Sequence, residues 1–594
     1  MSEAGSRFAS FPIATALREA LREGYGRQQL IADILAGIVV GIIALPLAMA
    51  LAIGAGVPPQ HGLYTAIVAG FLIALFGGSR GSVSGPTAAF IVILNPITAQ
   101  YGIAGLLLAT VMAGIILIVM GVARLGRLIE YIPHPVTTGF TLGISVVIAL
   151  LQVDGFLGLE LEGNPANFFE RMRMLAAALP TANWGDILVG GVALAIMILW
   201  PRLKTPVPAH LVAVTVAALL AYFGVKLVPD FAVATIGSQF SYVTADGQVM
   251  PGIPSTPPTL SWPWSWPGPD GEPFVLSFET LRSLIGPAFA IAMLGAIESL
   301  LCAVVVDNFL RTRHNPNAEL IGQGIGNVVA PFFGGITATA AIARSAAGVR
   351  AGARSPVSAI VHALVVLLAV VSLAQLLAYV PMSALAALLL MTAWNMSDLQ
   401  HVRNVLRIGP NSDRVVLLTC FALTVIFDMV VAVGVGTVLA ALLFMHRVGE
   451  VSGGRWMPEA QMPELKGKLP ADTRLYMLEG PLFFGAAEKA MTTLKRYEPD
   501  VRTLILWMGN VPIIDVTGLI ALSSALEHMR ERGIFVVFAG TRPTTRRLLR
   551  GAGIRTSEGI VFVPTLERAV AFAQRRSARL QQAAASEAEA PVAT

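Results

Sequence analysis

Long apolar runs occupy most of the first 450 residues of the chain. Eight of them contain no Asp, Glu, Lys or Arg and lie at residues 34–55, 105–122, 137–153, 187–200, 211–225, 284–297, 360–380 and 429–445. A helix that spans a bilayer needs about 20 mainly apolar residues. The pattern therefore predicts a polytopic α-helical membrane protein. The composition agrees, because only 13% of the residues are charged against roughly 25% in soluble proteins.

The pattern changes near Glu450. The short β-type runs "TRLYMLEGPLFF", "TLILWMG" and "GIFVVFAG" alternate with helical stretches, which is typical of an α/β domain with a largely parallel sheet. We therefore expect five parts: an N-terminal segment (1–28), a transmembrane domain (29–446), a linker (447–470), a soluble α/β domain (471–578) and a disordered tail (579–594).

Basic residues gather in alternate connections between the apolar runs, whereas the long connection 228–279 has acidic residues and no Lys or Arg. Lys and Arg accumulate on the cytoplasmic side of membrane proteins. We therefore expect both termini in the cytoplasm and an even number of spans, with room for 14 if several are short. This bias accounts for the net charge of +5, and we predict no nucleic-acid partner.

Two segments begin with small and polar residues where the surrounding chain is apolar: "SVSGPTAAFIVIL" (82–94) and "GGITATAAIARSAAGVRAGARS" (334–355). A helix that starts inside a membrane leaves backbone N–H groups free, and its dipole attracts anions. Matched broken segments in two halves of a chain indicate a transporter site. We expect the substrate to meet the N–H groups near Thr87, Ala88, Ala343 and Arg344. The alternative is a pair of re-entrant loops or kinks with a packing role.

Glu298 is the only charged residue between Ala288 and Val305. An ionisable residue inside the membrane is costly and is functional by default, so Glu298 is a candidate proton carrier. Helical spacing places Gly295 and Cys302 on its face. The alternative is a structural ion pair with Arg344.

Gln323 and Asn327 are four residues apart in "LIGQGIGN". They either line the substrate cavity or bond between helices.

The chain has no convincing Walker motif, nucleophile elbow or HExxH motif, so we do not expect an enzyme. Its two cysteines, both in apolar runs, offer no disulfide framework or zinc site. We predict no cofactor and no metal.

Several motifs together resemble the SulP anion-transporter family: "GLYTAIVAG", "SVSGPTAA", "GRLIEYIPHPVTTGFTLG", "AMLGAIESLLCA", "GQGIGNVVAPFFGGITATAAIARSA" and "NVPIIDVTGL". The resemblance runs collinearly from about residue 28 to 575. It implies 14 segments in a 7+7 inverted repeat, divided into core and gate domains, followed by a cytoplasmic STAS domain, and it implies a homodimer. It also implies that the two broken segments are spans 3 and 10, and that span 8 carries Glu298.

Two departures from the family pattern bear on the substrate. Leu47 follows Pro46 where many members carry a glutamine that helps to line the site, and Cys302 follows Glu298 where the sodium-coupled bicarbonate branch offers a hydroxyl. Both favour a proton-coupled carboxylate carrier. The closest resemblance, to the bacterial C4-dicarboxylate branch, implies import of C4-dicarboxylates such as succinate, fumarate and aspartate. A sulfate or bicarbonate carrier stays open, as does an uncoupled anion channel or sensor.

In the STAS domain, Thr517 of "IDVTG" takes the place of a residue that is phosphorylated in related anti-sigma-factor antagonists. The alternative is that Asp515 and Thr517 cap the next helix.

The expected partners are a small anion and a proton, membrane lipid, a second copy of the chain and an unidentified cytoplasmic partner of the STAS domain. We expect the protein in the bacterial inner membrane.

Overall fold

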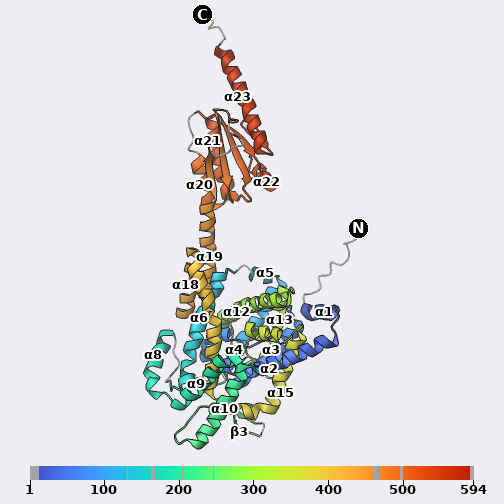
Figure 1. Ribbon diagram of the computed structural model, residues 1–594, viewed down its shortest axis with the longest axis vertical. Helices are drawn as coiled ribbons and strands as arrows, with labels where there is room; N and C mark the ends of the chain where they lie inside the picture. The colour runs from blue at the N-terminus through green and yellow to red at the C-terminus, as the bar shows by residue number, and fades with distance from the viewer. Residues whose placement is uncertain are drawn as a thin grey trace. The chain divides into compact units, whose positions relative to one another are not determined.

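The computed structural model describes residues 13–588 apart from 130–131, 162, 164–167, 204, 206, 245, 428, 459–464, 466 and 495–499. The chain forms two compact units, Met1–Val438 and Leu439–Thr594. The first unit is helical and contains the expected membrane spans up to the last one, the helix Met429–Val451, which continues into the second unit. The second contains a five-stranded sheet. Figure 1 shows the elements of both units.

Within the described residues, ten helices are long and apolar enough to cross a membrane. The helices that form the spans and their short companions are α2 (Arg27–Gly54), α3 (Pro59–Phe76), α4 (Ala88–Val122), α6 (His134–Leu151), α9 (Trp184–Leu199), α10 (Ala209–Leu227), α12 (Phe278–Leu310), α13 (Pro316–Val329), α14 (Ile342–Arg350), α15 (Val357–Leu377), α16 (Met382–Ser397), α18 (Asn411–Ile426) and α19 (Met429–Val451).

The helix α4 consists of two halves. Gly102 has a non-helical backbone (φ 70°, ψ −174°) and separates residues 88–101 from 103–122. Only glycine adopts a positive φ without steric cost, and a Cβ at this position would lie 2.2 Å from the carbonyl carbon of Gly268. Gly102 therefore allows both the break in the helix and the close approach of the Gly268 backbone.

With these halves counted separately, and with α13, α14 and α18 added to the ten long helices, the described chain has 14 segments. They fall into two sets of seven that start at α2 and α12. In each set the third segment is short and follows a two-residue strand, β1 (Ser84–Gly85) before α4 and β4 (Thr339–Ala340) before α14. The predicted repeat is confirmed.

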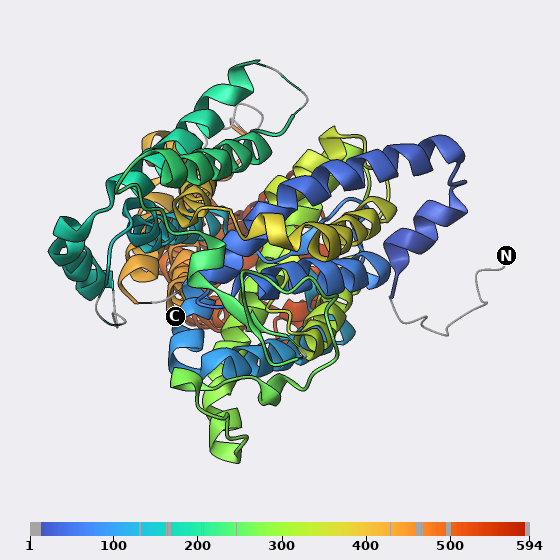
Figure 2. The same ribbon diagram turned by 90° about the horizontal axis from the view of Figure 1, so that it is seen from below.

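The two sets intermix in space. The core group consists of α2, α3, α4, α12, α13, α14 and α15, which pack mainly against one another, and the gate group consists of α6, α9, α10, α16 and α18. In Figure 2 the blue helices α2 and α3 lie beside the yellow-green α15, as their contacts require. The helix α16 packs against α2 and joins the two groups.

Small residues allow α4 and α13 to pack closely. A Cβ on Gly114 of α4 would lie 2.7 Å from the carbonyl oxygen of Gly324 of α13, and a Cβ on Gly324 would lie 2.6 Å from that of Gly114. Membrane helices associate through close packing of this kind, since lipid supplies little hydrophobic driving force between them.

The remaining elements of the first unit connect these helices: α1 (Thr15–Arg22), α5 (Gly126–Ile129), α7 (Val153–Leu157), α8 (Phe168–Ala178), α11 (Ile236–Gln239), α17 (Leu399–Ile408), the hairpin β2 (Ser241–Val243) and β3 (Val249–Pro251), and 3-10 turns η1 (Leu179–Thr181), η2 (Trp200–Leu203), η3 (Pro263–Ser265), η4 (Pro269–Gly271) and η5 (Ala330–Phe333).

The second unit is an α/β domain with both faces of its sheet covered. The strands lie in the order β5 (Gly453–Met457), β6 (Thr473–Glu479), β7 (Thr503–Asn510), β8 (Phe535–Ala539), β9 (Ile560–Val563). Only the β5–β6 pair is antiparallel. The helices are α20 (Phe484–Leu494), α21 (Val516–Glu531), α22 (Pro543–Gly551) and α23 (Leu566–Ala588).

Alternation along the strands explains this arrangement. Tyr476 packs in one hydrophobic cluster with residues of α20, α21 and α22, whereas its neighbour Leu475 packs in another with Val570 of α23. Strands buried on both faces read as nearly continuous hydrophobic runs. The predicted α/β domain with a largely parallel sheet is confirmed.

Two boundaries differ from the sequence prediction. The predicted linker 447–470 contains the end of α19 and the strand β5, which joins the sheet by pairing with β6. The predicted disordered tail is helical as far as Ala588, because α23 continues through "QQAAASEA". Ala, Gln and Glu are strong helix formers, so the composition of this segment favours a helix over a disordered tail. Residues 589–594 lie outside the described residues.

Candidate functional site

A very short antiparallel ladder brings the two broken segments together. Ser84 pairs with Ala340, and Gly85 pairs with Thr339. The half-helix of α4 starts at Ala88, and α14 starts at Ile342. Because each helix begins within three residues of the ladder, their N-terminal ends lie side by side. The free N–H groups of two first turns therefore gather at one place.

Polar side chains satisfy the irregular backbone around this ladder. Asn327 of α13 donates to the carbonyl oxygen of Ala338 at 2.9 Å and accepts from the N–H of Ala338 at 2.7 Å. Thr65 of α3 accepts from the N–H of Ile336 at 2.7 Å. Non-helical backbone survives at membrane depth only where protein or a cavity satisfies it. These side chains support the backbone that leads to α14.

Glu298 reaches the start of the other half-helix. The hydroxyl of Thr87 donates to Oε2 of Glu298 at 3.0 Å. Thr87 is the N-cap residue of α4, and its side chain makes no capping hydrogen bond. Glu298 is partly exposed. The carboxyl of the central acidic residue is therefore fixed beside the free end of α4.

Arg344 approaches the same place from α14. Its Nη2 donates to the carbonyl oxygen of Pro86 at 2.5 Å, and the residue is 2% exposed. A Cβ on Gly85 would lie 2.8 Å from its Nη1, so the absence of a side chain at Gly85 leaves room for the guanidinium. In the described residues, Nε and Nη1 of Arg344 have no hydrogen-bond partner.

The two opposite charges do not form a direct pair. Among the described residues, no ion pair within 4 Å joins Arg344 to Glu298, and each has a different hydrogen-bond partner. Arg344 is still near enough for its charge to act on Glu298 through space. The structural ion pair considered from the sequence is therefore absent in this structure.

The other candidates differ in how far they are buried. Ala88 is buried at the first position of α4, and Ala343 is exposed at the second position of α14. Leu47 is half-buried on α2 beside Pro46. Gly295 is buried, and a Cβ on it would meet Phe90 at 3.5 Å.

Gln323 and Asn327 bond within the core group. Nε2 of Gln323 donates to the hydroxyl of Ser84 at 3.0 Å and to Oε1 of Glu319 at 3.3 Å. Asn327 serves the Ala338 backbone described above. Both side chains hold the ladder and the backbone beside it, and the partners of these bonds are Ser84 of β1, Ala338 before β4 and residues of α13 itself rather than another helix.

Two buried acidic residues that the sequence pattern did not single out hold backbone beside β1 and α14. Glu319, which is 1% exposed, accepts from the N–H groups of Gly78 and Ser79 at 2.9 and 3.0 Å. Asp33 accepts from the N–H groups of Arg354 and Ser355 at 2.6 and 3.2 Å. The two acids hold the connection that leads to β1 and the connection that follows α14. The signal for Glu319 was its position four residues before Gln323, on the same helix face.

Comparison with known proteins identifies this arrangement. Residues 30–420 match the sulfate permease family. The chain belongs to this family. Residues 464–569 match the STAS domain, so the resemblance to SulP transporters with a C-terminal STAS domain is confirmed. The protein is therefore a multi-pass anion transporter.

This chain aligns with two curated relatives over most of their length. The candidate sulfate transporter YvdB of Bacillus subtilis is 37% identical over 533 residues, which are 90% of this chain and 95% of YvdB. The bicarbonate transporter BicA of Picosynechococcus sp. is 28% identical over 528 residues, 84% of this chain and 86% of BicA. The finer assignment to C4-dicarboxylates has no counterpart in these names.

Solved structures agree on the fold. The transmembrane domain of a cyanobacterial BicA superposes with a TM-score of 0.57 at 26% identity, covering 70% of this chain and 98% of its own. The murine solute carrier 26 family member A9 superposes with a TM-score of 0.81 at 19% identity, covering 96% and 97%. The second likeness shows a shared fold alone.

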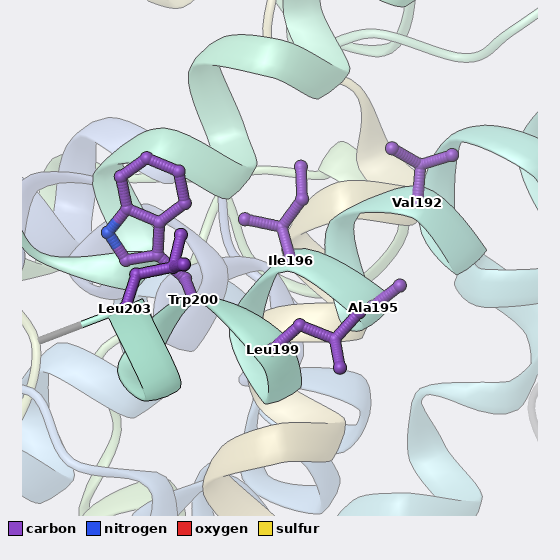
Figure 3. Close-up of a pocket in the computed structure, with 6 residues that line it drawn as sticks. All are labelled: Val192, Ala195, Ile196, Leu199, Trp200 and Leu203. Carbon is purple, nitrogen blue, oxygen red and sulfur yellow. The ribbon is translucent and has the colours of Figure 1, made fainter.

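An apolar hollow of this anion transporter lies away from the paired helix starts. Val192, Ala195, Ile196, Leu199, Trp200 and Leu203 of α9 and η2 line it (Figure 3). An anion site needs hydrogen-bond donors or positive charge, and these side chains supply only an indole N–H. That N–H donates to the carbonyl oxygen of Val207 at 3.0 Å. The hollow is therefore no candidate for the anion site.

The STAS domain of this permease positions Thr517 in the first turn of α21, where its side chain is exposed. Asp515 caps the helix by accepting from the N–H of Gly518 at 2.7 Å. Asp515 therefore has the capping role considered from the sequence, and Thr517 does not share it.

Proposed function

We propose that this anion transporter is a proton-coupled importer of small organic dianions, the C4-dicarboxylates such as succinate, fumarate and aspartate. The observation that carries the proposal is the meeting of two helix N-termini with the unpaired donors of Arg344. A helix N-terminus attracts a carboxylate through its free N–H groups and its dipole. Two such ends suit a ligand with two carboxylates.

The partly exposed Glu298 supports the coupling to protons. An ionised Glu298 beside an incoming dianion would repel it, and protonation removes that repulsion. Cys302 lies one turn later, and its Sγ donates to the hydroxyl of Ser345 at 3.3 Å. A thiol is a poor ligand for a hard cation, which prefers oxygen, and this favours a proton over sodium.

A second candidate function is the carriage of sulfate or bicarbonate. The names of YvdB and BicA favour it, and one oxyanion would also suit Arg344. Leu47 argues for the dicarboxylate, because an apolar residue at that place offers no hydrogen bond to a compact oxyanion.

The setting of the transporter is part of the proposal. We place it in the bacterial inner membrane as a homodimer, with both termini and the STAS domain in the cytoplasm. Thr517 is exposed there and is the proposed site of regulation by a cytoplasmic partner or by phosphorylation.

Uptake by purified protein in liposomes tests the proposed function. The panel consists of labelled succinate, fumarate, aspartate, sulfate and bicarbonate, each with and without an imposed pH gradient and with sodium absent. We expect gradient-driven accumulation of the dicarboxylates. Accumulation of sulfate or bicarbonate alone would establish the second candidate, and equilibration without accumulation would indicate a channel or sensor.

Substituting Ala88 by Pro tests the N–H of the first half-helix. Pro is well tolerated at the first position of a helix, and Thr87 already has the extended backbone (φ −128°, ψ 154°) that a residue before Pro prefers. We expect succinate affinity to fall by about tenfold, the effect of one lost hydrogen bond to a charged group. Ala88→Gly, which retains the N–H, is the control. Normal affinity in a folded Ala88→Pro protein would remove this N–H from the site.

Ending the chain after Ser452 tests the role of the STAS domain. The cut lies between α19 and β5, so it removes the whole sheet and leaves the spans intact. We expect the shortened protein to bind succinate with unchanged affinity, while turnover or assembly changes. Isothermal titration of both proteins in detergent measures this. Complete loss of binding in a well-folded shortened protein would mean that the STAS domain contributes to the site.

A further inference from the structure

We propose that the hydroxyl of Thr87 is the element that couples the proton to the anion, by reversing the direction of its hydrogen bond with Glu298. The inference rests on the proposed proton-coupled function and assigns a positioning role to one further side chain. It starts from two facts about Thr87. Its hydroxyl donates to Oε2 of Glu298 at 3.0 Å, and it is the N-cap residue of α4 without capping the helix.

A hydroxyl has one proton to donate, and an ionised carboxylate can only accept. While Glu298 is ionised, it takes the single proton of Thr87. The hydroxyl then presents only lone pairs to the free end of α4, and lone pairs repel an anion.

Protonation of Glu298 reverses this bond. A protonated carboxyl has an O–H of its own, so it donates to Oγ1 of Thr87. The proton of Thr87 is then free to point at the start of α4, where the unpaired N–H groups of the first turn lie. An anion at that end gains a donor only after the proton has bound to Glu298. By linkage, bound anion favours the protonated form equally.

Among the described residues around Glu298, Thr87 is the one whose hydrogen bond can change direction when Glu298 is protonated. The elements packed against α12 are α4, α5, α13, α14 and β4. Their ionisable residues are Tyr101 of α4, Arg127 of α5, Glu319 of α13 and both Arg344 and Arg350 of α14. The helix α12 itself also carries Glu279, Arg282, Cys302 and Asp307. Of these, Arg344 acts on Glu298 through its charge, but it bonds to Pro86 and stays positive in both protonation states. In the described residues the hydrogen-bond partner of Glu298 is Thr87.

The test measures the KM of succinate uptake into sodium-free liposomes between pH 5.5 and pH 8, with equal pH on both sides. The KM of the wild type is expected to fall as the pH is lowered. Thr87→Val has nearly the same shape and no hydroxyl. It is expected to lose about tenfold in affinity at acidic pH, the effect of one hydrogen bond to a charged group. Its KM is expected to depend on pH less steeply than that of the wild type, because only the repulsion between ionised Glu298 and the dianion remains. Thr87→Ala is the second variant if the valine protein does not fold.

Two controls separate the switch from a packing effect. Thr87→Ser retains the hydroxyl and is expected to restore the pH dependence. Thr98→Val makes the same change on the same half-helix, where the hydroxyl of Thr98 donates only to the carbonyl oxygen of Leu94, and is expected to behave as the wild type. A KM raised equally at every pH in Thr87→Val would overturn the proposal in favour of packing. An unchanged pH dependence would also overturn it.

Glu298→Gln supplies an independent arm, since its amide donates to Thr87 permanently. This variant is expected to keep the low KM up to pH 8, and the double variant with Thr87→Val is expected to lose it. If the double variant binds as Glu298→Gln does, the hydroxyl plays no part, although the proposed function stands. If the wild type takes up sulfate rather than succinate, the same comparison is made with sulfate. Uptake of neither overturns this inference together with the proposed function.

Discussion

Glu298→Gln is expected to abolish the accumulation of succinate that a pH gradient drives, while succinate exchange continues. Gln at this place imitates the protonated acid permanently, so the substrate still binds but no proton travels with it. In the wild type, a gradient of two pH units supports about 100-fold accumulation for each coupled proton, since each unit is worth about 1.4 kcal/mol. In the variant the ratio of internal to external succinate is expected to stay near one.

The measurement is uptake of labelled succinate into sodium-free liposomes with and without the gradient. Glu279→Gln is the matched control, because Glu279 lies on the same helix and is exposed. It is expected to accumulate succinate as the wild type does. Gradient-driven accumulation by Glu298→Gln would show that another group carries the proton.

Arg344→Gln is expected to weaken succinate binding by between about tenfold and 100-fold, which corresponds to roughly 1.5–3 kcal/mol for a hydrogen bond to a charged group. The guanidinium is buried, and two of its nitrogens have no partner in the described residues. Such nitrogens suit a carboxylate, which a guanidinium can bind with two parallel bonds. The amide of Gln retains a donor but neither the charge nor this geometry.

Binding of succinate to the detergent-purified protein by titration calorimetry measures the effect. Arg350→Gln is the control, since Arg350 lies on the same helix α14 and is exposed. Arg344→Lys keeps the charge without the planar fork and is expected to lie between the wild type and Arg344→Gln. Wild-type affinity in a folded Arg344→Gln protein would remove Arg344 from the site.

The helix starts of this site could be predicted from the sequence, because small, polar and helix-breaking residues mark them locally. Of the two broken segments, 82–94 contains the start of α4 at Ala88, and 334–355 contains the start of α14 at Ile342. Glu298 was also evident, since one acidic residue stands out in an apolar helix.

The contacts between these residues could not be predicted in the same way. The ladder has two residues in each strand, which is too short for any alternation of polar and apolar positions to show. Thr87 and Glu298 are 211 residues apart, and their contact depends on how α4 packs against α12. An ion pair of Arg344 with Glu298 was the alternative considered from the sequence, but the guanidinium of Arg344 bonds to Pro86, where the absence of a side chain at Gly85 leaves room for it.

In the STAS domain too, locally marked features could be predicted and features that depend on pairing could not. Its strands were visible as apolar runs, and the capping role of Asp515 follows from its place before a helix. The strand β5 was missed because "GGRWM" contains two glycines and an arginine, which are poor signals for a strand. Its place in the sheet comes from pairing with β6.

The most direct test of the proton-coupled mechanism follows protons and succinate together. Wild-type protein is reconstituted in sodium-free liposomes that contain a pH-sensitive dye, and labelled succinate is added outside at equal pH. We predict that the interior acidifies as succinate enters, with both fluxes abolished or reduced together by Arg344→Gln and with acidification absent in Glu298→Gln. Entry of succinate into wild-type liposomes without acidification, or entry only when sodium is present, would contradict the account.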